Sequence, residues 1–134
     1  MQASKYIEFD HSFNDDEKFQ ASSLQLSCNL NNSACKLKLG KYLEASKLCT
    51  KVLELDPCNV KALFRRSQAY LRISELEKAE VDVKTVLAID PNNREVRHVY
   101  QELNDKKKEY FRHDAEIFTK MLSRMGAAPY KNIL

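Results

Sequence analysis

Three cations recur at helical spacing in the middle of the sequence. Arg65 and Arg72 follow Lys61 by four and eleven residues, so a helix would place all three on one side. Cations gathered in a concavity suit a ligand that carries carboxylates, because charge-assisted hydrogen bonds strengthen when they are partly shielded from water. The alternative is that these are ordinary solvated side chains, paired with nearby Glu or Asp. Which of the two holds depends on the elements that position them.

The sequence offers little for catalysis or metal binding. His11, His98 and His113 are scattered, and the adjacent His113 and Asp114 cannot share one helix face. No pair of cysteines has the two-residue spacing of a zinc or redox site, so reduced, packed thiols are expected at Cys28, Cys35, Cys49 and Cys58. We therefore predict no enzyme, no catalytic residue, no metal and no cofactor in this chain.

Composition favours one soluble domain built from helices. The chain has 134 residues, of which 43% are hydrophobic and 31% charged, with only two glycines and three prolines. A net charge of +3 is weak evidence for nucleic acid, and cations interleaved with aromatic residues are scarce. No apolar run reaches the ~20 residues that span a bilayer, and nothing resembles a signal peptide. The expected location is the cytoplasm, with the nucleus as a second compartment, and neither nucleic acid nor membrane is an expected partner.

The sequence repeats with a period of 34 residues. Residues 51–59 align with residues 85–93, and Ala45 aligns with Ala79. This period, with small residues at fixed points and a terminal Asp-Pro, is typical of the tetratricopeptide repeat (TPR), a helix-turn-helix unit. One hairpin cannot cover its own apolar face, so stability comes from stacking. The predicted fold class is an all-α TPR superhelix of two complete repeats and a partial first repeat, with a long C-terminal capping helix.

The repeat boundaries predict the following organisation. The segments are a remnant of the first repeat and a loop at 1–14, repeats at 15–57 and 58–92, a capping helix at 93–125 and a flexible tail at 126–134. Within them, helices are expected at about 15–39, 42–55, 59–73, 76–89 and 93–125, with residues 1–9 the end of an earlier helix and 10–14 a loop.

Local signals support these boundaries. Asp-Pro pairs end two of the helices, Asn14 and Glu17 offer a capping pair after the loop, and Asn59 and Asn93 are good N-caps. The apolar stripe is expected at Leu48, Val52, Leu55, Val83, Val86 and Ile89. The charged residues of the 76–89 helix are expected on its surface, namely Glu77, Lys78, Glu80, Asp82 and Lys84.

In stacked TPR hairpins the first helix of each repeat lines the concave face. With Leu26 and Val60 as first positions, the groove-facing positions include Lys61, Arg65 and Arg72. The polar residues predicted to bind a peptide are Asn31, Lys38, Lys61, Arg65, Gln68 and Arg72.

Asn31 within residues 28–39, together with Lys61-Ala-Leu-Phe-Arg-Arg66, resembles the carboxylate-clamp TPR domain of large FKBP-type immunophilins, with wording closest to plant members. The resemblance covers nearly the whole chain. It implies that Asn31, Lys61 and Arg65 grip the C-terminal Glu-Glu-Val-Asp tail of heat-shock protein 90, or of heat-shock protein 70. In such immunophilins a separate FKBP domain carries the peptidyl-prolyl isomerase activity.

The resemblance also implies an incomplete clamp. The family takes a further Lys and Asn from the first helix of the first repeat, and this chain begins after that helix. An apolar edge is then expected near Tyr6, Ile7, Phe9 and Phe19, which would favour a homodimer or scaffold as an alternative function. The chain is expected to bind the chaperone tail only weakly by itself.

The last helix carries a second alternative. Three lysines precede bulky apolar residues, a pattern similar to calmodulin targets and to a segment of plant immunophilins. The residues concerned are Lys106, Lys107, Lys108, Tyr110, Phe111, Phe118, Met121 and Leu122. Four acidic residues between 105 and 116 reduce the net charge of this stretch, and simple capping of the last repeat explains the same pattern.

Overall fold

The computed structural model describes the backbone of residues 2–126 and the side chains of residues 15–126. The predicted tail therefore lies, apart from Gly126, outside the described residues. The described chain forms five helices and no strand, which confirms the all-α TPR class. They are α1 (Gln2–Lys38), α2 (Tyr42–Leu55), α3 (Val60–Arg72), α4 (Leu76–Ile89) and α5 (Arg94–Arg124).

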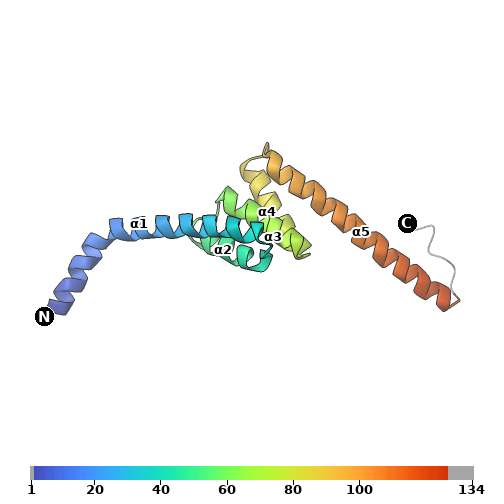
Figure 1. The fold of residues 1–134 in the computed structure, drawn as a ribbon, viewed down its shortest axis with the longest axis horizontal. Coiled ribbons are helices and arrows are strands. Elements are labelled where there is room, and N and C mark those ends of the chain that lie inside the picture. The colour runs from blue at the N-terminus through green and yellow to red at the C-terminus, as the bar shows by residue number, and fades with distance from the viewer. Residues whose placement is uncertain (1, 127–134) are drawn as a thin grey trace.

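The repeats stack at the centre of the molecule. Figure 1 shows the C-terminal half of α1 packed with α2, then α3 with α4, and the start of α5 covering the last hairpin. The N-terminal part of α1 and the C-terminal half of α5 project from opposite sides of this stack. Ala45 and Ala79 are fully buried where their helices meet, as close helix packing requires.

The turns within the two hairpins use the same backbone geometry. Gly40 has a φ of 75°, and Ser74, one period later, has a φ of 62°. Asn59 caps α3 by accepting a hydrogen bond from the Ala62 amide at 2.9 Å, and Asn93 caps α5 by accepting one from the Val96 amide at 3.0 Å. The two asparagines predicted as N-caps are thus confirmed.

The loop predicted at residues 10–14 is not present, and this prediction was wrong. Helix α1 runs without interruption from Gln2 to Lys38, so Asn14 and Glu17 do not mark a helix start. The physical reason is local: between residues 2 and 38 the sequence has neither proline nor glycine to end a helix. Residues 2–14 and 15–38 are therefore not separated by a break in the backbone.

In α2 and α4, the second helices of the two repeats, the apolar stripe does not end at the predicted residues. Val52, Val83 and Val86 are buried, whereas Leu55 and Ile89 are 50% and 44% exposed, contrary to expectation. The core instead receives the residues two positions earlier, Leu53 and Leu87. At 3.6 residues per turn these positions lie about 200° away, on the side that faces the next helix.

Asp82 is a third correction, because it is buried rather than on the surface. Only 1% of the residue is exposed, and Arg66 of α3 donates two hydrogen bonds to its carboxylate, at 2.7 and 2.6 Å. Arg66 also reaches the Thr50 hydroxyl of α2 at 3.2 Å. The paired carboxylate raises the pKa of Arg66 further above its ordinary value. A bidentate ion pair therefore joins α3 to α4, and a further hydrogen bond from Arg66 joins α3 to α2.

The thiol of Cys49 should react far more slowly than the other three thiols of the chain. Cys49 is fully buried, and burial raises its pKa, so little reactive thiolate forms at neutral pH. Cys28, Cys35 and Cys58 are exposed. Titration with a chromogenic disulfide should show three thiols that react fast and one that reacts only when the protein unfolds. Four fast thiols would show that the α1–α2–α3 packing around Cys49 opens readily.

Candidate peptide-binding groove

Helix α3 carries four polar residues along one face. The Asn59 cap fixes its start, and Lys61, Arg65, Gln68 and Arg72 then follow at steps of four, three and four residues. These steps place the four side chains in one row, as the sequence predicts. At 1.5 Å per residue, the row spans about 16 Å from Lys61 to Arg72.

Arg65 connects this row to α1. Its Nη1 donates a hydrogen bond to the carbonyl of Leu30 at 2.7 Å, next to the predicted ligand-binding residue Asn31. A guanidinium has five N–H donors, so most of the Arg65 donors remain for a ligand. The side chain is half-buried, and its contact with α1 fixes it before any ligand arrives.

The other predicted residues near this point are exposed. Within the described part of the chain, Lys61, Asn31 and Lys38 make no side-chain hydrogen bond or ion pair. Their cationic and amide groups therefore face water and are available to a ligand. No acidic side chain of the described chain neutralises Lys61 or Lys38.

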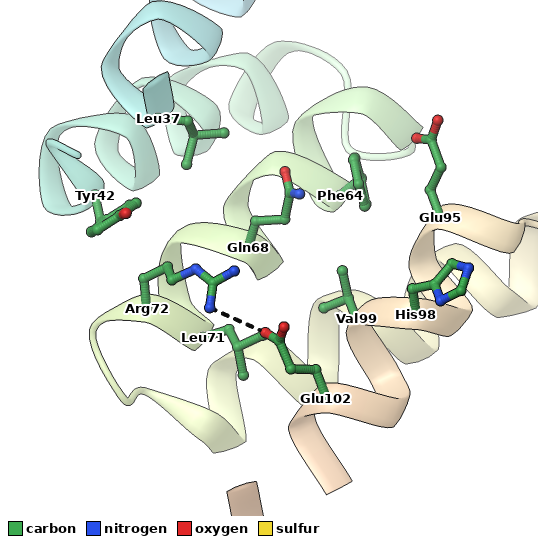
Figure 2. A pocket seen from close by; sticks show the side chains of 10 residues that line it. All are labelled: Leu37, Tyr42, Phe64, Gln68, Leu71, Arg72, Glu95, His98, Val99 and Glu102. Carbon is green, nitrogen blue, oxygen red and sulfur yellow. Dashed lines mark hydrogen bonds and ion pairs between the residues drawn. The ribbon is translucent and has the colours of Figure 1, made fainter. Parts of the chain in front are cut away.

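A pocket of about 500 Å³ opens at the far end of the row. Figure 2 shows that Gln68 and Arg72 reach it from α3 and that Tyr42 closes one side from α2. Apolar side chains from four helices form much of the wall, namely Leu37, Tyr42, Phe64, Leu71 and Val99. Two of the six predicted binding residues thus line the pocket, and the other four do not.

Helix α5 supplies a side of the pocket that the sequence reading missed. Glu95, His98 and Glu102 follow at steps of three and four residues and line the wall opposite α3. Glu102 accepts a hydrogen bond from Arg72 Nη1 at 3.3 Å, and the two side chains point toward each other in Figure 2. Arg72 is therefore a paired cation, unlike Lys61. The i, i+3, i+7 spacing of these residues was the available signal.

Comparison with known proteins identifies the repeat. The family model for the tetratricopeptide repeat matches residues 36–103, which is half of the chain. The chain belongs to the tetratricopeptide repeat family. That match spans the end of α1 to the buried start of α5, so the groove described above lies on a TPR scaffold.

The similarity of this TPR chain to large immunophilins is also confirmed. It is 32% identical to human peptidyl-prolyl cis-trans isomerase FKBP4 over 121 residues, which is 90% of the chain. Human FK506-binding protein-like is 50% identical over 64 residues, which is 48% of the chain and 18% of that protein. The chain spans about a quarter of the length of FKBP4, 26%.

Solved structures with a similar fold include a co-chaperone and a chaperone. The Hsp90 co-chaperone Cns1 from Saccharomyces cerevisiae superposes with a TM-score of 0.71 at 27% identity, over 78% of this chain and 34% of Cns1. The myosin chaperone UNC-45 from C. elegans, solved in complex with a Hsp90 peptide, gives a TM-score of 0.64 at 28% identity. That match covers 97% of this chain and 16% of UNC-45.

The residues predicted to bind calmodulin divide into two groups on the TPR stack. Lys106 donates to the Leu71 carbonyl at 3.3 Å, Lys107 pairs with Glu80, and the Tyr110 hydroxyl lies 3.1 Å from that of Ser74. These contacts fix α5 on the last hairpin. Of the remaining residues, Lys108, Phe111, Phe118 and Met121 are exposed and Leu122 is half-buried, and those after Tyr110 belong to the part of α5 beyond these contacts.

The described residues form neither a cluster of metal ligands nor a membrane-spanning helix. The described residues contain no group of three or more His, Cys, Asp or Glu side chains that could hold a metal ion. None of the described helices combines the length and the apolar character that crossing a bilayer requires.

Proposed function

We propose that this TPR domain binds the acidic C-terminal tail of heat-shock protein 90, ending in Glu-Glu-Val-Asp, through Asn31, Lys61 and Arg65. The observation that carries the proposal is the position of Arg65, which is held on α1 beside Asn31 while Lys61 remains unpaired within the described chain. An amide and two cations that converge on one ligand can orient a terminal carboxylate and an Asp side chain. Cns1 and the peptide-bound UNC-45 support the choice of partner.

The proposal extends to related partners and to location. The tail of heat-shock protein 70 is a second ligand of the same chemistry, and both partners would place the protein in the cytoplasm, with the nucleus to be tested. FKBP4 is an isomerase by name. If this chain is a segment of such a protein, we propose that the isomerase domain lies in sequence outside residues 1–134.

The test compares two forms of one peptide. An acetylated tail peptide with a free C-terminal carboxylate and the same peptide with a C-terminal amide are titrated calorimetrically into the chain. We expect a Kd weaker than about 1 μM for the free acid, because the site proposed within residues 1–134 holds it with one amide and two cations only. The amide should bind about 10–100-fold more weakly, since it loses a charge-assisted hydrogen bond. Equal affinities for the two forms would exclude a carboxylate clamp.

The projecting half of α5 supports calmodulin binding as a second candidate function. Phe111 and Met121 are 65% and 53% exposed, and Lys108 and Arg112 adjoin Phe111. Bulky apolar anchors beside cations are what a calmodulin groove accepts. A calcium-dependent shift on a native gel, abolished by Phe111→Glu together with Met121→Glu, would support it. An unchanged gel would leave α5 as a capping helix.

The homodimer alternative rests on the projecting part of α1. There Phe19 and Leu24 are 74% and 67% exposed, whereas the side chains of Tyr6, Ile7 and Phe9 lie outside the described residues. Sedimentation at several concentrations separates a dimer from a monomeric peptide binder.

A further inference from the structure

The pocket between α3 and α5 has two walls of opposite charge. Its α3 wall continues the row of Lys61 and Arg65 to Arg72, whereas its α5 wall carries Glu95 and Glu102. Arg72 and Glu102 neutralise each other at 3.3 Å. Glu95 is exposed and makes no side-chain hydrogen bond or ion pair within the described chain, so no side chain of the described residues neutralises it.

A peptide whose acidic end is held at Lys61 and Arg65 and whose chain runs along α3 toward Arg72 would reach this pocket. The row from Lys61 to Arg72 is about 16 Å long, and an extended chain advances about 3.3 Å per residue. Residues within about five positions of the C-terminal end therefore lie along the pocket, which extends from Phe64 and Glu95 to Arg72 and Glu102. The position of the acidic end at the cations thus determines which ligand residues meet α5.

We propose that the α5 wall selects the ligand upstream of its acidic end, and that it favours a basic side chain there over an acidic one. This inference rests on the proposed function. An acidic side chain at the pocket would face Glu95 and would have to displace Glu102 to reach Arg72. A basic side chain would instead pair with Glu95 and leave the Arg72–Glu102 pair intact. The preferred ligand is therefore a dipolar tail, basic upstream and acidic at its end.

The expected preference is modest, because Glu95 is exposed and exposed pairs are weak. A pair of this kind changes a dissociation constant by about 1.5–5-fold. Attraction of lysine and repulsion of glutamate act together, so the two peptides should differ by about threefold or more. The difference should shrink as ionic strength rises, since salt screens exposed charges.

The experiment uses tail peptides in which one upstream position at a time is Lys, Ala or Glu, while the free acidic end is kept. Their affinities are measured for the unaltered chain and for Glu95→Lys and Glu109→Lys. Glu109 is exposed on α5 outside the pocket, so it provides the same change of charge elsewhere. We expect lysine to bind best at one position in the unaltered chain, Glu95→Lys to reverse that order, and Glu109→Lys to keep it.

Several results would overturn the proposal. One is equal affinity for the Lys and Glu peptides at every position, and another is a preference for glutamate. A third is that Glu95→Lys and Glu109→Lys change the preference for lysine over glutamate by the same amount. If Glu95→Lys lowers helix content, Glu95→Gln replaces it and should abolish the preference rather than reverse it. The amidated peptide separates this proposal from the clamp. Binding that depends on the free carboxylate but ignores the upstream residue removes only the selection by α5, whereas no binding to any peptide removes both.

Discussion

Replacing Asp82 by alanine should lower the free energy of unfolding by about 3–5 kcal/mol. Arg66 would lose the carboxylate that accepts two of its hydrogen bonds, and its guanidinium would remain largely buried, with only 20% of the side chain exposed. An uncompensated buried charge is far more costly than a lost surface pair. Since whole domains are stable by only about 5–15 kcal/mol, this is a large fraction of the total.

The measurement is urea unfolding followed by far-UV circular dichroism, with Cys49 labelling as a second probe. Glu77→Ala is the matched control, because Glu77 is an exposed acid on the same helix without a side-chain partner in the described chain. It should change stability by about 0.5 kcal/mol or less. The double variant Arg66→Met/Asp82→Leu should be close to the original, because removing both charges leaves neither one unpaired. A small effect of Asp82→Ala would mean that Arg66 relaxes into water.

The second large effect is expected in ligand binding. Arg65→Ala should weaken binding of the free-acid tail peptide by about 2–5 kcal/mol, because the bound carboxylate would lose a partly buried, preorganised partner. Lys61→Ala should cost about 1.5–3 kcal/mol, or about 10–100-fold in Kd. Calorimetric titration, with competition for the weakest variants, measures both.

Stability distinguishes the two variants. Lys61 is exposed and unpaired within the described residues, so its removal should leave the unfolding midpoint unchanged. Arg65→Ala also removes the bond to the Leu30 carbonyl and should destabilise the α1–α3 contact by about 1–3 kcal/mol. Lys51→Ala, an exposed lysine on α2, is the control and should affect neither quantity. Normal peptide affinity in folded Lys61→Ala protein would refute the proposed clamp.

Much of the fold could be predicted from local signals. Helices α2 and α4 have the predicted bounds, and α3 and α5 differ from prediction by one residue at each end. These signals are the Asp-Pro pairs, two asparagine caps and a glycine turn. Each acts within a few residues, so each can be recognised from the sequence alone. The continuous α1 was missed because a capping pair was given more weight than the lack of any helix breaker in that stretch.

The candidate site could be predicted only along a single helix. Periodicity placed Lys61, Arg65, Gln68 and Arg72 on one face of α3, and no contact between helices was needed for that step. It could not show that Arg65 bonds to α1 or that Arg72 is paired with Glu102. These partners are 35 and 30 residues away in sequence.

The sequence by itself therefore determined the repeat, the helices and the row of cations, because each depends on spacing within one helix or one period. The tertiary structure alone decided that Asp82 is buried with Arg66, that Glu95 and Glu102 form the second wall of the pocket, and which half of α5 projects. The physical reason is that burial and pairing depend on how successive hairpins stack, and stacking brings together side chains that no local pattern relates.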